Sequence, residues 1–382
     1  MTKSELVRTV FRWYNIDKQD ENVYNYGKPR HHKVKEYKEY METDQMSAQT
    51  IWIGSYSSPE KEGLLRCSFG PVTGFTAGTA YTGLLNPSYL LEHPVHPVLY
   101  TVEETDEGAV CAWREENDRL IPAGKVQTGG ASPCHLSLSA DGNWLYCANY
   151  MGGSAACIRL DKNGIPVELT DLVKHHGEGP DKQRQEMAHA HCVYPYHGQI
   201  GVCDLGEDRI YLYENQAGKL RETACLRTKP GSGPRHLAAH AKYPACLYCV
   251  SELTGDVAVW RETAPGCFDL QQELNTLPDG YSGENTAAAI RFTEDGRWLL
   301  VSHRGADGIA AMSVRMDGTL EEPVWSPCVR GPRDFLICGS TVLIGGQRDG
   351  EVRAYTLEAG KLSDSGFRIE VRDPVCIQKA LY

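Results

Sequence analysis

The fold is decided by residues 135–174, which read HLSLSADGNWLYCANYMGGSAACIRLDKNGIPVELTDLVK. Four apolar runs, HLSLS, WLYCANY, AACIRL and VELTDLVK, alternate in this stretch with short polar loops, and none has the 3.6-residue period of a helix. The loop between the first two runs contains Asp141-Gly142, a pair typical of a tight hairpin turn. The stretch therefore predicts one antiparallel sheet of four strands.

The second strand of this sheet, WLYCANYM, recurs along the chain. Six other segments resemble it: TIWIGSYS, VLYTVEET, IGVCDLGE, LYCVSELT, LLVSHRGA and VLIGGQRD. Alignment of the seven segments places one polar or small residue at an equivalent position near each end, namely Ser55, Glu103, Asn149, Asp204, Ser251, His303 and Gly346. Neighbouring positions are 43 to 55 residues apart, which is the period of a four-stranded propeller blade. Seven copies predict an all-β, seven-bladed β-propeller over residues 48–382.

The two ends of the repeat region predict how the ring closes. The first repeat, at 51–56, has no inner strand before it, whereas the last repeat has four strands of its own and leaves PVCIQKALY over. We expect residues 375–381 to pair beside 50–56 in the first blade, so that no sheet edge stays open. Residues 1–47 lie outside the repeats, and we expect an extension that is either partly helical, with Ser4 as the N-cap, or flexible.

Charge and cysteine content limit the possible partners and the compartment. The chain of 382 residues has 39 Lys and Arg against 50 Asp and Glu, a net charge of −11, which disfavours binding to nucleic acid or to a membrane surface. A local cluster of Arg and His can still bind a small anion. The fourteen cysteines lie mostly within apolar runs and no export signal accompanies them, so we expect reduced thiols in a cytoplasmic protein. The oligomeric state stays open.

Charged and imidazole side chains gather where the expected strands begin or end. Inner strands begin SPCHLSLS, MAHAHCVY, GPRHLAAH and GPRDFLIC, which contribute His135, His189, His191, Arg235, His236 and Arg333. The ends of second strands contribute Asn149, Glu252, His303, Arg304 and Gln347. Because these strand ends meet at one face of a propeller, the side chains are candidates to line its central funnel.

The types of residue in this set indicate an acid–base reaction on a small anion. The chain has no GxSxG nucleophile elbow, no Walker loop and no dinucleotide-binding GxGxxG. Arginine binds carboxylate or phosphate in a bidentate manner and stabilises an oxyanion, while His or Glu moves a proton. His189 and His191, with Asp204 as a third ligand, form a conceivable metal site, but no established zinc motif supports it, and we expect neither metal nor cofactor.

The segments resemble the lactonase family of seven-bladed propellers, whose members include a bacterial 6-phosphogluconolactonase and a fungal carboxy-muconate lactonizing enzyme. The resemblance covers about residues 49–382 and rests on GGASPCHLSLSADGNWLYCANYMGGS, MAHAHCVYPYHGQIGVCDLGEDRIYLY, GSGPRHLAAHAKYPACLYCVSEL, AAAIRFTEDGRWLLVSHRG, GPRDFLICG and the terminal PVCI. It implies a metal-free central cleft built from His189, His191, Arg235, His236, Glu252 and Arg304. Relatives usually carry glutamate where this chain has Ala289 and asparagine where it has His303.

These observations predict a lactone hydrolase acting on a small anionic sugar lactone. In this prediction His189 or Glu252 activates water, while Arg235 and Arg304 polarise the carbonyl group. The acid or phosphate group of the substrate would be held by His135, Asn149, His191, His236, His303, Arg333 and Gln347. One alternative is a muconate-type cycloisomerase, in which a carboxylate adds across a double bond of the same molecule. The other is a catalytically silent propeller that binds a ligand or a protein, for which Ala289 is the main support.

Overall fold

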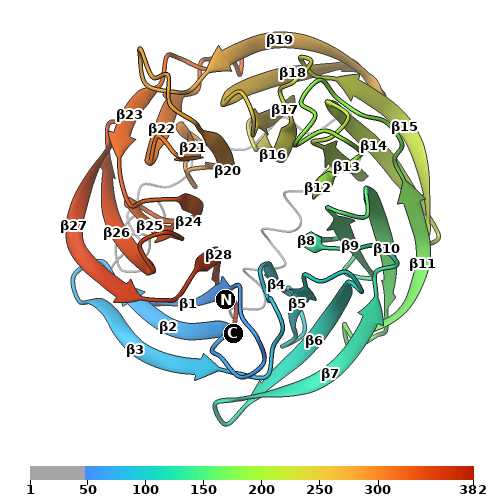
Figure 1. Cartoon of the computed structure of the whole chain (residues 1–382), viewed down its shortest axis with the longest axis vertical. Coiled ribbons are helices and arrows are strands. Elements are labelled where there is room, and N and C mark those ends of the chain that lie inside the picture. Colours follow the sequence, from blue (N-terminus) through green and yellow to red (C-terminus); the bar gives the residue numbers. More distant parts are fainter. Residues whose placement is uncertain (1–47) are drawn as a thin grey trace, which may run out of the picture.

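The computed structural model describes residues 48–382 and contains seven four-stranded antiparallel sheets around a central channel (Figure 1). This arrangement confirms the predicted all-β, seven-bladed propeller. The expected helical or flexible extension, residues 1–47, lies outside the described residues. Within residues 48–382, no helix is long and apolar enough to cross a lipid bilayer.

Each blade is one sheet, and its four strands follow one another from the channel outward. Blade one contains β28 (Pro374–Lys379), β1 (Gln49–Ser55), β2 (Leu64–Gly70) and β3 (Gly74–Tyr81). Blade two contains β4 (Leu90–Glu92), β5 (Leu99–Glu103), β6 (Ala109–Glu116) and β7 (Arg119–Gln127), and blade three contains β8 (Pro133–Leu138), β9 (Trp144–Asn149), β10 (Ser154–Leu160) and β11 (Pro166–Lys174). Blade four contains β12 (Ala190–Tyr196), β13 (Gln199–Asp204), β14 (Arg209–Gln216) and β15 (Lys219–Arg227), and blade five contains β16 (Pro234–His240), β17 (Tyr243–Ser251), β18 (Asp256–Ala264) and β19 (Cys267–Asn275). Blade six contains β20 (Thr286–Phe292), β21 (Trp298–Arg304), β22 (Gly308–Ser313) and β23 (Val324–Pro327), and blade seven contains β24 (Pro332–Cys338), β25 (Thr341–Gly346), β26 (Glu351–Glu358) and β27 (Lys361–Glu370).

Blade three shows how local sequence forms a sheet. Its four strands coincide with the four apolar runs of residues 135–174. Gly142, in the turn between β8 and β9, has a φ of 69°, a backbone conformation that glycine adopts without steric cost. The Asp141 carboxylate accepts the backbone N–H of Asn143 at 3.1 Å and fixes the same turn.

The hydrophobic core consists of seven separate clusters, each between two neighbouring blades. Side chains of one strand alternate between the two interfaces of their blade. On β17, Cys246 packs toward blade six, whereas Cys249 packs toward blade four. The apolar side chains pack between neighbouring blades. The channel, which the inner strands line, is therefore available for polar side chains.

The ring closes as the leftover C-terminal strand predicted. β28 pairs antiparallel with β1, with Ile377 opposite Ile53, and the two strands lie side by side at the junction of the first and last segments in Figure 1. Asp334, on the inner strand of blade seven, accepts the backbone N–H of Ile377 at 2.9 Å. Blade seven therefore holds the closing strand through a buried carboxylate as well as through apolar contacts.

Candidate active site

Strand pleating decides which polar residues reach the channel. The equivalent positions Asn149, Asp204 and His303 are completely buried inside their blades. Side chains of consecutive strand residues point to opposite sides, so the residue after each position points the other way. Two such residues, Glu252 and Arg304, lie within 3.0 Å of each other in the central cleft.

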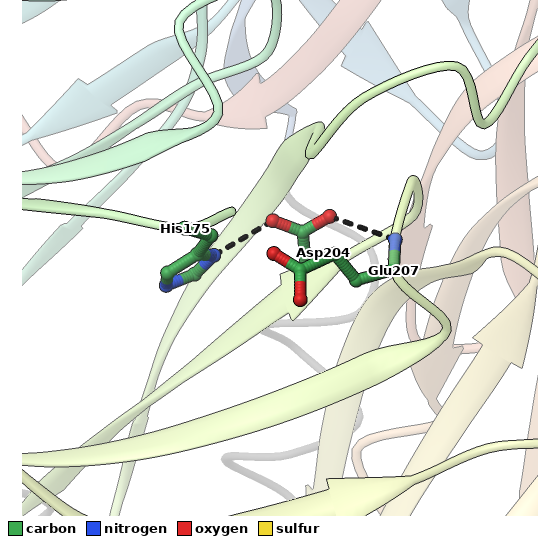
Figure 2. A group of neighbouring side chains, drawn as sticks. All are labelled: His175, Asp204 and Glu207. Atoms are coloured by element: carbon green, nitrogen blue, oxygen red, sulfur yellow. Dashed lines mark hydrogen bonds and ion pairs between the residues drawn. The ribbon is translucent and has the colours of Figure 1, made fainter. Parts of the chain in front are cut away.

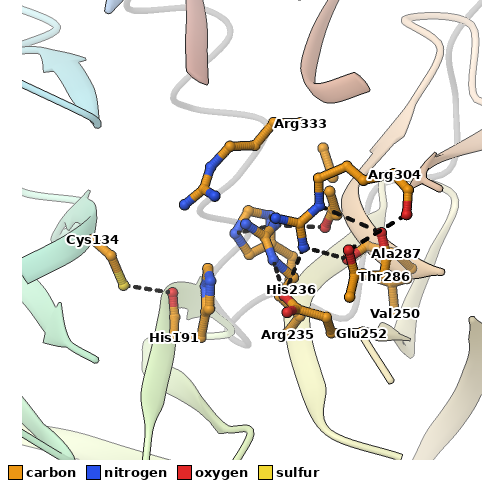
Figure 3. Close-up of polar contacts among 12 residues, drawn as sticks. Cys134, His191, Arg235, His236, Val250, Glu252, Thr286, Ala287, Arg304 and Arg333 are labelled. Atoms are coloured by element: carbon orange, nitrogen blue, oxygen red, sulfur yellow. Dashed lines mark hydrogen bonds and ion pairs between the residues drawn. The ribbon is translucent and has the colours of Figure 1, made fainter. Parts of the chain in front are cut away.

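Glu252 is the centre of the largest polar group in this cleft (Figure 3). Its Oε2 accepts a hydrogen bond from Nε of Arg235 at 2.7 Å and lies 3.0 Å from Nη2 of Arg304. Its Oε1 accepts a hydrogen bond from Nη2 of Arg184 at 2.5 Å. These arginines come from blade five, blade six and the connection between β11 and β12, so one carboxylate joins three parts of the chain.

A second group lies on the opposite wall, where blades one, two and seven meet. The Tyr56 hydroxyl accepts a hydrogen bond from Nη2 of Arg333 at 2.9 Å and donates one to Oε1 of Glu104 at 3.1 Å. The Ser88 hydroxyl donates to Oε2 of Glu104. We refer to Glu252, Glu104 and the four arginines at positions 184, 235, 304 and 333 as the cleft cluster.

The cleft cluster contains four guanidinium groups and two carboxylates, an excess of two positive charges. Burial alone would raise the pKa of Glu252, but Arg304 and Arg235 hold it well below its usual range. Burial, together with neighbouring arginines, lowers the pKa of Arg304 to about 9, although Glu252 acts in the opposite direction. The cleft is therefore built to receive negative charge.

Three imidazoles extend the site along the channel. The ring of His236 lies 5.3 Å from that of His191 and 5.0 Å from that of His135, measured between ring centroids. Burial, and then the charge of Arg235, lower the pKa values of His191 and His236 well below the usual range. Nδ1 of His191 is buried and has no hydrogen-bond partner among residues 48–382. His191 thus offers an uncharged imidazole with a free nitrogen beside the arginines.

Two cavities that differ in size and charge lie in the channel. A cavity of about 20 Å³, enough for one water molecule, lies among the cleft residues Glu104, Cys134, His191, Arg235 and Arg333. A larger one, of about 390 Å³, is lined by later residues of the inner strands, and His236 and Tyr89 border both. Most of its lining is apolar, and its one formally charged residue, Arg291, is paired with Asp334 at 2.7 Å. Charge therefore marks the smaller cavity as the place for an anionic substrate.

The structure places His189 outside the lining of the smaller cavity, contrary to expectation. Nδ1 of His189 lies 3.1 Å from the carbonyl oxygen of Tyr150, and Nε2 lies 3.2 Å from Oε1 of Glu186. Its ring stacks on the ring of Tyr150 at 4.5 Å. The pairing of β12 with β13 shifts register between Ala190 and Cys192, and only the second histidine of the HxH motif, His191, lines the cavity.

Asn149 and His303 also lie outside the cleft, contrary to expectation. Nδ2 of Asn149 donates to Oγ of Ser154 at 3.1 Å within blade three. The ring nitrogens of His303 lie 2.9 Å from Oγ1 of Thr276 and 3.1 Å from Nδ2 of Asn285. Both side chains have hydrogen-bond partners within the blades or their connections, and neither lines the smaller cavity.

The remaining predicted residues divide between the cleft and its surroundings. Arg333 belongs to the cleft cluster, and His135 lines the larger cavity, with its Nε2 2.9 Å from the Tyr89 hydroxyl. Gln347 follows β25, is partly exposed, and donates its backbone N–H to the carbonyl of Gly331 at 3.1 Å. Ala289 is buried in the apolar cluster between blades six and seven. A missing carboxylate at 289 therefore does not argue for a silent propeller.

Sequence reasoning missed three members of the site. Tyr56 and Glu104 directly follow the equivalent positions, and the alternation that brings Glu252 into the cleft was the signal for them too. Arg184 lies in the connection between β11 and β12, residues 175–189, where no strand periodicity exists. Only the length of this connection indicated that it could reach over a face of the ring.

One group of side chains beside the cleft has the composition of a cation site. His175, Asp204 and Glu207 offer ligand atoms within 4.8 Å of one another (Figure 2). Nδ1 of His175 lies 2.7 Å from Oδ2 of Asp204, and its Nε2 lies 2.9 Å from the Tyr213 hydroxyl. Both ring nitrogens are thus engaged in a hydrogen-bonded chain, which gives this group a structural explanation.

Comparison with known proteins agrees with the fold. The family described as Lactonase, 7-bladed beta-propeller, matches residues 50–379. The 6-phosphogluconolactonase of Bacillus subtilis (strain 168) is 27% identical over 340 residues, which cover 86% of this chain and 97% of that protein. The periplasmic gluconolactonase of Pseudomonas aeruginosa superimposes with a TM-score of 0.81 at 26% identity, over 88% of this chain and 100% of that one. A protein structure from Lactobacillus plantarum gives a TM-score of 0.79 at 28% identity, over 87% and 100%. The chain belongs to the seven-bladed β-propeller lactonase family.

Proposed function

We propose that this protein is a lactonase that hydrolyses a small anionic sugar lactone, in the manner of a 6-phosphogluconolactonase. The observation that carries the proposal is the gathering of four guanidinium groups in one cleft, where two of them, those of Arg235 and Arg333, line a cavity together with His191, whose Nδ1 is free. A phosphate monoester carries a charge of roughly −1.5 to −2 at neutral pH, which matches the positive excess of the cleft cluster. A sugar lactone with a phosphate group supplies this charge and a carbonyl for attack in one molecule.

Substrate entry requires side chains to move. A cavity of about 20 Å³ holds a water molecule but not a sugar ring. The Arg184 side chain is 36% exposed, whereas those of Arg235 and Arg304 are 3% and 16% exposed. Arg184 is therefore the arginine best placed to turn from Glu252 toward an incoming anion. The two more deeply buried arginines remain to polarise the lactone carbonyl and stabilise the oxyanion that forms on it.

His191 is the proton acceptor in this proposal. A carboxylate held by three arginines, as Glu252 is, has a low pKa and accepts a proton poorly. The nitrogens of His189 already have partners. His191 is neutral because burial, and then nearby arginines, lower its pKa. The negative charge of a bound substrate offsets the arginines, which makes His191 a stronger base at the moment of attack. Water loses a proton to His191, its oxygen bonds to the carbonyl carbon, and the proton then passes to the ring oxygen that leaves.

One comparison of substrates tests the proposal. Purified protein is assayed with 6-phosphogluconolactone and with a carboxy-muconate, each corrected for the uncatalysed reaction. We expect turnover of the lactone, loss of activity in His191→Asn, and retention in His240→Asn. His240 is a buried histidine outside the cleft cluster, and its ring nitrogens contact the Gly296 carbonyl and nearby backbone amides. Muconate turnover would indicate the cycloisomerase instead. Activity with neither compound would support the binding propeller.

We also propose that the protein acts in the cytoplasm. All fourteen cysteines lie within the described residues, none forms a disulfide, and eleven are buried. Free thiols in this number suit a reducing compartment. Fractionation of the native cells, followed by immunoblotting, checks the location, and recovery from an oxidising compartment would contradict it.

A further inference from the structure

The connection between β11 and β12, residues 175–189, delivers Arg184 to the cleft. Nη2 of Arg184 donates to Oε1 of Glu252 at 2.5 Å and lies 3.4 Å from the Tyr150 hydroxyl. Residues in a connection of this length have many accessible conformations, so holding one arginine over the cleft has an entropic cost. Something outside the cleft must fix the connection before substrate arrives.

Asp204 joins the two ends of this connection with one carboxylate. Its Oδ2 lies 2.7 Å from Nδ1 of His175, the first residue of the connection (Figure 2). Its Oδ1 accepts the backbone N–H of His189, the last residue, at 2.8 Å. Asp204 itself is completely buried at the end of β13. The carboxylate thus closes residues 175–189 into a loop with a fixed base.

The middle of the connection is fastened to the same blade. Gln185, next to Arg184, donates from Nε2 to the carbonyl oxygen of Leu205 and to Oδ1 of Asp208, both at 2.8 Å. On the other side of Arg184, Asp181 accepts the backbone N–H of Gln183 at 2.9 Å. Arg184 is therefore held between anchored neighbours, and its side chain alone remains free to reorient.

We infer that Asp204 is a positioning residue of the active cleft, acting through Arg184 to set the affinity for the anionic substrate. The expected effect on substrate affinity rests on the proposed function, whereas the expected release of residues 175–189 does not. In Asp204→Ala both carboxylate oxygens are removed, so the side chain can contact neither His175 nor the His189 backbone N–H. Both ends of the connection are then released, and Arg184 loses its preorganised place.

Limited proteolysis tests whether Asp204 holds the two ends of the connection in place. Trypsin cleaves after Lys182 and Arg184, both in the connection, and locally released segments are cut faster than anchored ones. We expect cleavage at these two sites, located by mass spectrometry, to be much faster in Asp204→Ala than in the wild type. His240→Asn is the matched control, since it removes a similarly buried histidine contact on β16, outside the connection. Equal cleavage rates in Asp204→Ala and His240→Asn would overturn the inference.

A double-mutant cycle tests whether Asp204 acts through Arg184. Calorimetry measures the dissociation constant of 6-phosphogluconate, and steady-state kinetics measure KM and kcat with the lactone, in Asp204→Ala, Arg184→Ala and the double variant. Each single change should weaken binding about tenfold, the value of one charge-assisted hydrogen bond, with a smaller effect on kcat. The double variant should be no worse than Arg184→Ala, because the two changes remove one interaction. If the loss of affinity in the double variant equalled the product of the two single losses, Asp204 would act independently of Arg184. That result would overturn the inference.

The remaining outcomes separate this inference from the proposed function. If the wild type binds 6-phosphogluconate but does not hydrolyse the lactone, the lactonase proposal fails. The double-mutant cycle then still measures, from the dissociation constants, whether Asp204 acts through Arg184. If the wild type binds no anion, both the lactonase proposal and the affinity role of Asp204 fail. If Asp204→Ala does not fold, His175→Gln releases one end only and should give the same faster cleavage and the same non-additivity with Arg184→Ala.

Discussion

Glu252 and Arg235 face each other across two adjacent strands of blade five, with Nε of Arg235 donating to Oε2 of Glu252 at 2.7 Å. Nη1 of the same arginine donates to the carbonyl of Ala288 in blade six at 2.7 Å. The planar guanidinium therefore satisfies partners in two directions at once. This geometry, rather than the charge alone, is what the cleft requires of Arg235.

We expect Arg235→Lys to lose most activity although it keeps the positive charge. An ammonium group reaches either Glu252 or Ala288 but not both, and it lacks the fork that binds an oxyanion in a bidentate manner. The expected loss in kcat/KM is about tenfold to hundredfold, equivalent to one hydrogen bond to a charged group. Steady-state kinetics measure it, with Arg297→Lys, an exposed pair with Asp295, as the control. Full activity in Arg235→Lys would place the substrate elsewhere.

Glu252→Gln and His191→Asn should have different kinetic signatures. His191→Asn removes the proton acceptor and should lower kcat by about 10²–10⁴-fold with KM little changed. Glu252→Gln leaves buried arginines without their carboxylate, so we expect a higher KM and a loss of stability of about 3–5 kcal/mol. Kinetics and thermal unfolding on both variants check this. A large fall in kcat for Glu252→Gln, with normal kcat for His191→Asn, would assign the base to Glu252.

The pH dependence of activity should reflect the depressed pKa of His191. A base is active when unprotonated, so a pKa well below 6.5 moves the acidic limb of the profile to lower pH. We expect kcat/KM to stay level from about pH 8 down through 6.5 and to fall only in more acidic buffer. The profile must be recorded with the lactone's spontaneous hydrolysis subtracted. A half-loss near pH 6.5 would indicate a histidine with an ordinary pKa.

His303 should affect acid stability rather than turnover. Burial, followed by the charge of Arg304, lowers the pKa of His303 from 6.5 to about 3. Below pH 6.5 the unfolded chain takes up a proton that the folded chain does not, so the contribution of neutral His303 is complete above pH 6.5 and is lost as the pH falls toward 3. In His303→Asn we expect Tm to depend less on pH in this window, with kcat essentially unchanged. A drop in kcat beyond about tenfold would return His303 to the cleft.

Removal of the closing strand should disrupt the ring. Deletion of residues 374–382 leaves β1 as an unpaired apolar edge between two blades, which favours aggregation. We expect a much lower Tm and increased light scattering. Deletion of Leu381 and Tyr382 alone, which are 46% and 49% exposed, provides the control. An unchanged Tm after the longer deletion would show that the ring does not depend on β28.

The ring was predictable from sequence because each blade repeats the same local pattern. Seven strand ends at a nearly constant period indicated seven sheets, and the unpaired PVCIQKALY indicated their closure. The site was predictable only in part, because one residue of register changes the direction of a side chain. Arg304 and Glu252 were identified as cleft residues, while Asn149 and His303, one position earlier in their strands, face the blade interior.

Two further residues show where local pattern stops being informative. His189 and His191 are two apart and would share one face of a regular strand, but β12 begins after His189 and its pairing is irregular there. Arg184 depends on the fold of residues 175–189, which is set by side-chain hydrogen bonds to blade four rather than by strand periodicity. Neither position can be found from apolar spacing alone.

The group of three arginines around Glu252 is complete only in the assembled ring. Because Arg235, Arg304 and Arg184 come from blades five and six and from the connection between blades three and four, no single blade contains the complete anion-binding surface. An anion that binds only the closed ring stabilises it by mass action, in proportion to the logarithm of its concentration. Under the proposed function, abundant phosphorylated sugar acids would then slow unfolding and proteolysis in the cell, and the level of the protein would follow the supply of such anions.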